Sequence, residues 1–265
     1  MLYGATNFPL RPLADEIRTL AGLGFDFLEV CLDPPEASPA RIDANLPAIE
    51  AAIAETGLKP RVGHLPTFVW LADIYDSIRR ASLKEVDSAL ETCARLGLKK
   101  AVVHPGYITG LLTFIPQLGQ NLVYRSLEEL LASAERLRVT LCLENMFPRA
   151  GCFFRPEEFT EVLARYPQLM MTLDLSHGQI QAPPERMAGL IAAGGRRIRH
   201  VHVSDNRGQD DEHLPLGTGR VDLAGGFSAL KKLGYDDTIT LEVFAPDRDY
   251  LAMSLSKVKA LWEKA

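Results

Sequence analysis

Short apolar runs alternate with longer amphipathic segments along the whole chain, and this alternation limits the possible folds more than any other feature. Eight runs are expected to be strands buried on both faces, as in a parallel sheet: Leu2–Ala5, Phe27–Val30, Lys59–Val62, Ala101–Val103, Thr140–Leu143, Met170–Leu173, Ile198–Val203 and Thr238–Val243. Eight segments with helical periodicity follow them in turn: Leu13–Leu23, Ala44–Thr56, Leu83–Leu96, Leu118–Leu137, Pro156–Tyr166, Pro184–Ala193, Leu223–Leu233 and Tyr250–Glu263. Glycine stops are expected after four of them, at Gly24, Gly57, Gly97 and Gly234.

Eight strand–helix units without a linker predict an α/β protein with one domain over residues 1–265. Strict alternation implies a parallel sheet, and eight units of this total length favour a closed (β/α)₈ TIM barrel. A doubly wound open sheet is the alternative. It is disfavoured because the first strand lacks the glycine-rich turn of a dinucleotide fold.

The net charge and the cysteine pattern indicate which binding partners and which cellular compartment to expect. The net charge of −5 argues against sequence-independent binding to nucleic acid. The four cysteines are scattered and form no C-x-x-C pair, which is typical of a reducing compartment. No signal peptide or membrane-spanning run is evident. We therefore expect a cytoplasmic protein without membrane or nucleic-acid partners; its oligomeric state stays open.

Side chains that bind metals or transfer protons stand at the C-terminal ends of six successive strands. These are His64, His104, Glu144, Asp174, His202 and Glu242, from the third strand to the eighth. In barrel enzymes this end carries the active site. Three more candidates lie in the following loops, His177 after the sixth strand and Asp211 and His213 after the seventh. His200 precedes His202 by two residues, so it should point the same way one layer deeper, and we interpret it as structural.

Histidines and carboxylates without cysteine predict an open divalent-metal site. Zn²⁺ and Mn²⁺ suit such ligands, and Mg²⁺ or Co²⁺ are possible. The competing interpretation of Glu144 and Glu242 is a buried salt bridge, but few arginines stand near these strand ends. Buried carboxylates need a cation in either case. For His64, His104, His177 and His213, hydrogen bonding to the backbone or to substrate is an open alternative to a ligand role.

At these residues the chain resembles the xylose isomerase-like TIM barrel superfamily, which contains sugar and sugar-phosphate isomerases and epimerases and the endonuclease IV type of abasic-site nuclease. The resemblance is carried by the segments Gly63–Pro66, Val103–Gly106, Leu143–Asn145, Leu173–His177, His200–Asn206, His213–Gly219 and Leu241–Val243. It implies a central ion held by Glu144, Asp174, His202 and Glu242. In the nuclease branch it implies three zinc ions that also use His64, His104, His177, Asp211 and His213.

Two enzymatic hypotheses follow. The favoured one is an isomerase or epimerase of a sugar, sugar phosphate or related polyol ketone, in which Glu144 and Glu242 exchange a proton with the substrate through an enediolate stabilised by the metal. The alternative is an endonuclease IV-like phosphodiesterase. The acidic, proline-rich loop Cys31–Glu36, Thr67 in place of an aromatic residue and the negative charge count against the nuclease. A barrel that only binds a ligand is disfavoured because idle buried acids are costly.

Other polar groups of the loops at this end have weaker assignments. Arg207 is expected to bind oxygen atoms of a small carbohydrate substrate, whereas Arg149 is interpreted as a solvated loop charge. The segment Gly217–Arg220 is either a phosphate-binding loop or a tight turn. We prefer the turn.

Overall fold

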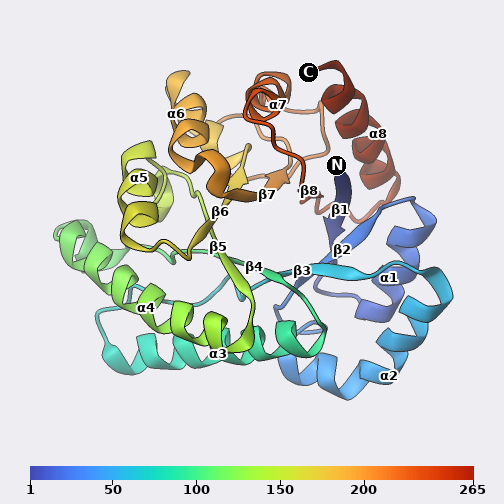
Figure 1. Ribbon diagram of the computed structural model, residues 1–265, viewed down its shortest axis with the longest axis horizontal. Coiled ribbons are helices and arrows are strands. Elements are labelled where there is room, and N and C mark those ends of the chain that lie inside the picture. Colours follow the sequence, from blue (N-terminus) through green and yellow to red (C-terminus); the bar gives the residue numbers. More distant parts are fainter.

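Eight parallel strands close into a barrel in which each strand pairs with its neighbours in chain order and β8 pairs with β1. The computed structural model describes residues 1–265, and Figure 1 shows the helices around the ring of strands. The strands are β1 (Leu2–Thr6), β2 (Phe27–Cys31), β3 (Pro60–His64), β4 (Lys100–Val103), β5 (Thr140–Glu144), β6 (Met170–Asp174), β7 (Ile198–Val203) and β8 (Thr238–Leu241). The predicted (β/α)₈ TIM barrel is confirmed.

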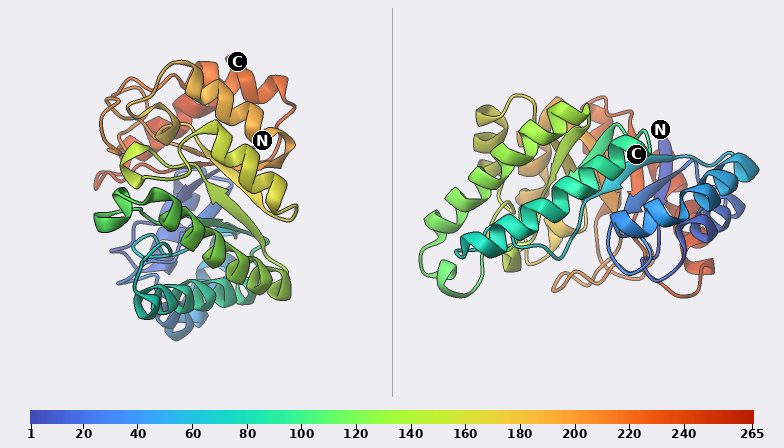
Figure 2. Two further views of the ribbon diagram at one scale, coloured as in Figure 1. Left: turned by 90° about the vertical axis from the view of Figure 1, so that its left-hand side faces the viewer. Right: turned by 90° about the horizontal axis from the view of Figure 1, so that it is seen from below.

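One helix follows each strand and covers the outside of the barrel, as the turned views in Figure 2 also show. The helices are α1 (Leu13–Gly22), α2 (Pro39–Thr56), α3 (Asp76–Arg95), α4 (Pro116–Leu137), α5 (Pro156–Arg165), α6 (Glu185–Gly194), α7 (Leu223–Lys232) and α8 (Asp249–Lys264). The four expected stop glycines all have left-handed φ angles, between 74° and 84°. A side chain at such a position would be strained, which is why glycine ends these helices.

Two helices begin earlier than the sequence predicted. Helix α2 begins at Pro39 and not at Ala44, and α3 begins at Asp76 and not at Leu83. Their first turns are mostly exposed, so no apolar periodicity marks them. Pro39 fits the first turn of α2, where its missing N–H is not needed. At the other end of the chain, β8 stops at Leu241, so Glu242 follows the strand and is not part of it.

The main core fills the space between strands and helices, while a smaller apolar cluster lies inside the barrel. Phe27, Val62 and Val102 form this inner cluster, against which Leu2 packs. Phe27 and Leu2 are the first residues of their strands, so the cluster occupies the N-terminal part of the barrel. The predicted site residues stand above this cluster, at the C-terminal ends of the strands.

The helix–strand contacts are close enough to constrain single residues. Gly63 of β3 is an example, because a Cβ atom there would collide with the Cys93 sulfur of α3. No helix of the fold combines the length and the apolar character that crossing a membrane requires.

Candidate metal centre and active site

Four residues at the C-terminal ends of four adjacent strands, β5 to β8, converge at one end of the barrel. Each of Glu144, Asp174, His202 and Glu242 offers one ligand atom, and these four atoms all lie within 4.8 Å of one another. His202 Nδ1 lies 3.3 Å from Glu144 Oε1 and 3.5 Å from Glu242 Oε2. All four side chains are buried. The parallel register makes this possible, because neighbouring strands end at the same level.

The unpaired atoms of this cluster fit a divalent cation. Glu144 Oε1, Asp174 Oδ2 and His202 Nδ1 are buried and have no hydrogen-bond partner. Such atoms are costly to bury unless a cation or a proton satisfies them. Three carboxylates and one imidazole form a donor set that suits Zn²⁺ or Mn²⁺. The residues present therefore match the expected metal.

Electrostatic coupling within the cluster is strong. Burial together with Glu144 and Glu242 raises the pKa of Asp174 to about 7, although His177 acts in the opposite direction. Burial would also raise the pKa of Glu144, but His202 and His104 outweigh it and hold that pKa well below its usual range. Without a metal ion, protons and imidazolium charges balance the acids, so a bound cation has to displace part of this positive charge.

His64 and His104 contact the other oxygen of Glu144. His104 Nε2 lies 3.1 Å from Glu144 Oε2, and His64 Nε2 lies 3.7 Å from the same atom. Burial lowers the pKa of His64, but Glu144 and Glu242 more than compensate and raise it to about 9. His64 Nδ1 lies 2.9 Å from the carbonyl oxygen of Leu65. The two imidazoles thus orient Glu144, and they are also close enough to it for a second metal site.

The remaining predicted residues, His177, Asp211 and His213, form a group beside the central cluster. Asp211 Oδ2 lies 3.1 Å from His177 Nε2 and 2.9 Å from His213 Nε2. Burial raises the pKa of Asp211, but the two histidines reverse the effect and lower it. His177 Nδ1 lies 3.2 Å from Glu144 Oε1, which links this group to the central cluster. All nine candidate histidines and acids are thus brought together at one end of the barrel.

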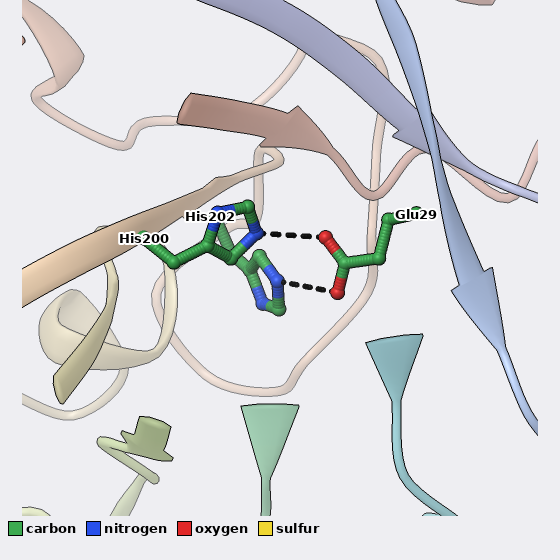
Figure 3. A group of neighbouring side chains, drawn as sticks. All are labelled: Glu29, His200 and His202. Carbon is green, nitrogen blue, oxygen red and sulfur yellow. Dashed lines mark hydrogen bonds and ion pairs between the residues drawn. The ribbon is translucent and has the colours of Figure 1, made fainter. Parts of the chain in front are cut away.

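One buried residue of the site was not found from the sequence. Glu29 of β2 accepts hydrogen bonds from His200 and His202, as Figure 3 shows. His200 lies deeper than His202 and binds no other site residue, in agreement with its structural interpretation. A lone carboxylate in the otherwise apolar run Phe27–Cys31 was the available signal. It was missed because the strand was interpreted as wholly apolar.

The structure also shows the surroundings of Arg207, Arg149 and the segment Gly217–Arg220, for which the sequence suggested contact with substrate, a solvated charge and a turn. Arg207 forms an exposed ion pair with Glu212 and does not line the cavity, so the structure does not support its expected contact with substrate. Arg149 is exposed and pairs with Asp210, as its interpretation as a solvated charge requires. The N–H groups of Gly217 and Gly219 donate to Asp205 Oδ2. The segment is therefore a turn, and these donors are not free for phosphate.

A cavity of about 440 Å³ opens above the cluster of candidate metal ligands. Imidazoles and carboxylates line its inner part: His64, His104, His177, Asp211, His213 and Glu242. Apolar and aromatic side chains from the loops line its outer part: Phe8, Pro9, Leu10, Pro34, Phe68, Tyr107, Met146, Phe147 and Phe244. No lysine or arginine lines it. The aromatic wall was not foreseen, because loop conformation decides which aromatic residues face inward.

Residues 17–261 match the model of the xylose isomerase-like TIM barrel family. The chain belongs to this family. It is 30% identical over 181 residues to an uncharacterised protein of Methanocaldococcus jannaschii, a match that spans 64% of this chain and 59% of that protein. It is 24% identical to fructoselysine 3-epimerase of Shigella flexneri, with 94% of this chain and 93% of the relative covered.

Solved structures of this family are also similar in fold. A D-tagatose 3-epimerase-like protein superimposes with a TM-score of 0.85 at 26% identity, covering 100% of this chain and 98% of the other. The IOLI protein, solved with a bound zinc atom, superimposes with a TM-score of 0.79 at 21% identity over 100% and 99% of the two chains. Among the curated relatives, the fructoselysine 3-epimerase and an L-ribulose-5-phosphate 3-epimerase of Salmonella typhimurium (26% identical, covering 95% of this chain and 88% of the relative) match over nearly the whole chain.

Proposed function

We propose that this protein is a divalent-metal-dependent epimerase of a ketose or related polyol ketone. The observation that carries the proposal is the convergence of the Glu144 and Glu242 carboxylates on His202 Nδ1, at 3.3 and 3.5 Å, next to a cavity of small-molecule size that Glu242 lines. Two carboxylates that flank one site are what a proton transfer between the two faces of a substrate carbon requires. The epimerase relatives support the same reaction class.

Each residue of the central cluster has a defined task in this proposal. Glu144, Asp174, His202 and Glu242 would hold the ion, which supplies positive charge to the oxygen atoms of the substrate when bound. One glutamate removes the proton from the carbon next to the carbonyl group and gives an enediolate. The opposite glutamate returns a proton to the other face. His104 and His177, which contact Glu144, fix the orientation of that carboxylate.

The walls of the cavity favour a substrate without a phosphate group. Phosphate sites in proteins use arginine, lysine or free backbone N–H groups, and this cavity has no basic side chain other than histidine. Asp33, Asp211 and Glu242 line it as well and would repel a dianion. The aromatic wall suits the C–H face of a sugar or an apolar substituent on it. We therefore propose a neutral ketose as substrate.

The nuclease alternative has one observation in its favour. Besides the central cluster, the groups His64–His104–Glu144 and His177–Asp211–His213 are each compact enough to hold an ion. Against the nuclease, Arg149 and Arg207 are paired with acids, and no lysine or arginine lines the cavity. We therefore favour the epimerase.

One experiment separates these activities. Metal content of the purified protein is measured first, and the protein is then assayed on free ketoses, on ketose phosphates and on an abasic-site oligonucleotide. We expect turnover of a free ketose with solvent deuterium incorporated at the carbon next to the carbonyl group, and at least tenfold lower kcat/KM for the matching phosphate. Strand nicking without ketose turnover would overturn the proposal.

A further inference from the structure

A hydrogen-bonded chain runs from the partly buried Lys100 along the inside of the barrel to His202 of the candidate metal cluster. Lys100 Nζ donates to Thr238 Oγ1 at 2.7 Å, and Thr238 Oγ1 lies 2.7 Å from His200 Nδ1. His200 Nε2 lies 2.7 Å from Glu29 Oε2, and His202 Nε2 lies 3.0 Å from Glu29 Oε1. Figure 3 shows both imidazoles directed at the single carboxylate of Glu29. Glu29, His200 and His202 are completely buried.

Counting donors and acceptors fixes the protons of this chain. An ammonium group has only donors, so the Thr238 hydroxyl accepts from Lys100 and its own hydrogen is available to His200 Nδ1. An ionised carboxylate can only accept, so a neutral His200 carries its ring hydrogen on Nε2, donates it to Glu29 and accepts the Thr238 hydrogen at Nδ1. Both oxygens of Glu29 are acceptors, so His202 also donates from Nε2. The Nδ1 atom of a neutral His202 is therefore left with a lone pair.

This lone pair lies where the metal ligands meet. His202 Nδ1 has no hydrogen-bond partner in the fold, and it is the atom that lies within 3.5 Å of both Glu144 and Glu242. We propose that Glu29 is a positioning residue that holds the His202 ring and its Nε2 hydrogen so that Nδ1 binds the metal ion. The inference rests on the metal centre of the proposed function but not on the proposed substrate.

An amide in place of the carboxylate would disturb this arrangement. A glutamine at position 29 has one acceptor oxygen and one NH₂ donor group, so it can accept from only one of the two imidazoles. If its NH₂ group faces His202, the ring hydrogen has to move to Nδ1 and block the metal site. If it faces His200, the Thr238 hydrogen bond is disturbed instead. Replacing such outer partners of metal ligands typically weakens metal binding by about 10–100-fold.

The first test compares metal binding by wild type, Glu29→Gln and a control variant. The control is Glu158→Gln, because Glu158 is also a buried carboxylate but accepts from the Phe154 and Arg155 N–H groups at the start of α5. Mn²⁺ is titrated calorimetrically into each metal-free protein. We expect at least tenfold weaker binding for Glu29→Gln and an unchanged Kd for Glu158→Gln. Glu29→Leu, which removes both acceptor oxygens, is titrated in the same way, and binding by this variant within threefold of wild type would overturn the proposal.

A spectroscopic readout keeps the proposal testable if Glu29→Gln does not fold. In Zn²⁺-loaded wild type with ¹⁵N-labelled histidine, the His202 ring should show a slowly exchanging hydrogen on Nε2 and a metal-bound Nδ1. A Zn²⁺-loaded protein whose His202 carries its hydrogen on Nδ1 would refute the role of Glu29. If wild type bound neither ion, the metal centre itself would fail, which the wild-type titration shows before any variant is compared.

Discussion

Replacing Asp174 by asparagine should stabilise the metal-free protein and at the same time reduce its response to metal. Asp174 Oδ1 accepts hydrogen bonds from the Ser176 and His177 N–H groups, while Oδ2 has no partner. Asparagine keeps the acceptor and removes one negative charge from the cluster.

The structure gives the size of the effect. Like charges 4.8 Å apart, the outer limit for the ligand atoms, repel by about 3.5 kcal/mol at an effective dielectric constant of about 20. Because nearby histidines offset much of this repulsion, we expect a gain of about 1–2 kcal/mol, or roughly 2–8 °C in Tm for a chain of this size. Metal at 1,000 times its Kd should stabilise wild type by about 4 kcal/mol, or roughly 8–16 °C.

Thermal unfolding at pH 8, with EDTA and with Mn²⁺, measures both effects. The matched control is Asp205→Asn, the same chemical change at a buried aspartate whose oxygens accept from the Gly217, Gly219 and Val221 N–H groups. This control should lower Tm equally in both conditions. A metal-free Asp174→Asn protein less stable than metal-free wild type, or an undiminished Mn²⁺ response, would contradict the electrostatic account.

Three further predictions concern catalysis, pH and packing. Glu242→Gln should keep the circular dichroism spectrum of wild type but lose at least about 10³-fold in kcat, since it loses a proton-transfer group and a ligand; near-normal turnover would exclude the acid–base role. Because the pKa of Asp174 is raised to about 7, a cation has to displace its proton at lower pH, so Mn²⁺ affinity should fall by up to about tenfold per unit below pH 7; calorimetric titrations at pH 5.5–8 test this, and a flat profile would contradict it. Gly63→Ala should cost about 1–3 kcal/mol of unfolding free energy in urea melts, because its Cβ meets the Cys93 sulfur; wild-type stability would show that α3 can shift.

The fold and the convergence of the candidate metal ligands could both be predicted from the sequence, and for the same physical reason. Parallel strands in a closed barrel end at one level, so polar residues at six strand ends have to meet once the alternation is recognised. Glu29 could not be placed in this way, because a strand buried on both faces gives no period that tells inward from outward positions. Arg207 and the aromatic wall depend on loop conformation, which tertiary contacts set. The first turns of α2 and α3 were not predicted because no apolar periodicity marks them.

The apolar cluster of Phe27, Val62 and Val102 lies inside the barrel and does not line the cavity. The ion and the ketose would then enter through the same opening, and the ion would bind deeper than the ketose. Loading would be ordered, since a seated ketose blocks the route by which the ion arrives or leaves. Chelators should consequently strip the ion from the resting enzyme faster than from enzyme saturated with substrate.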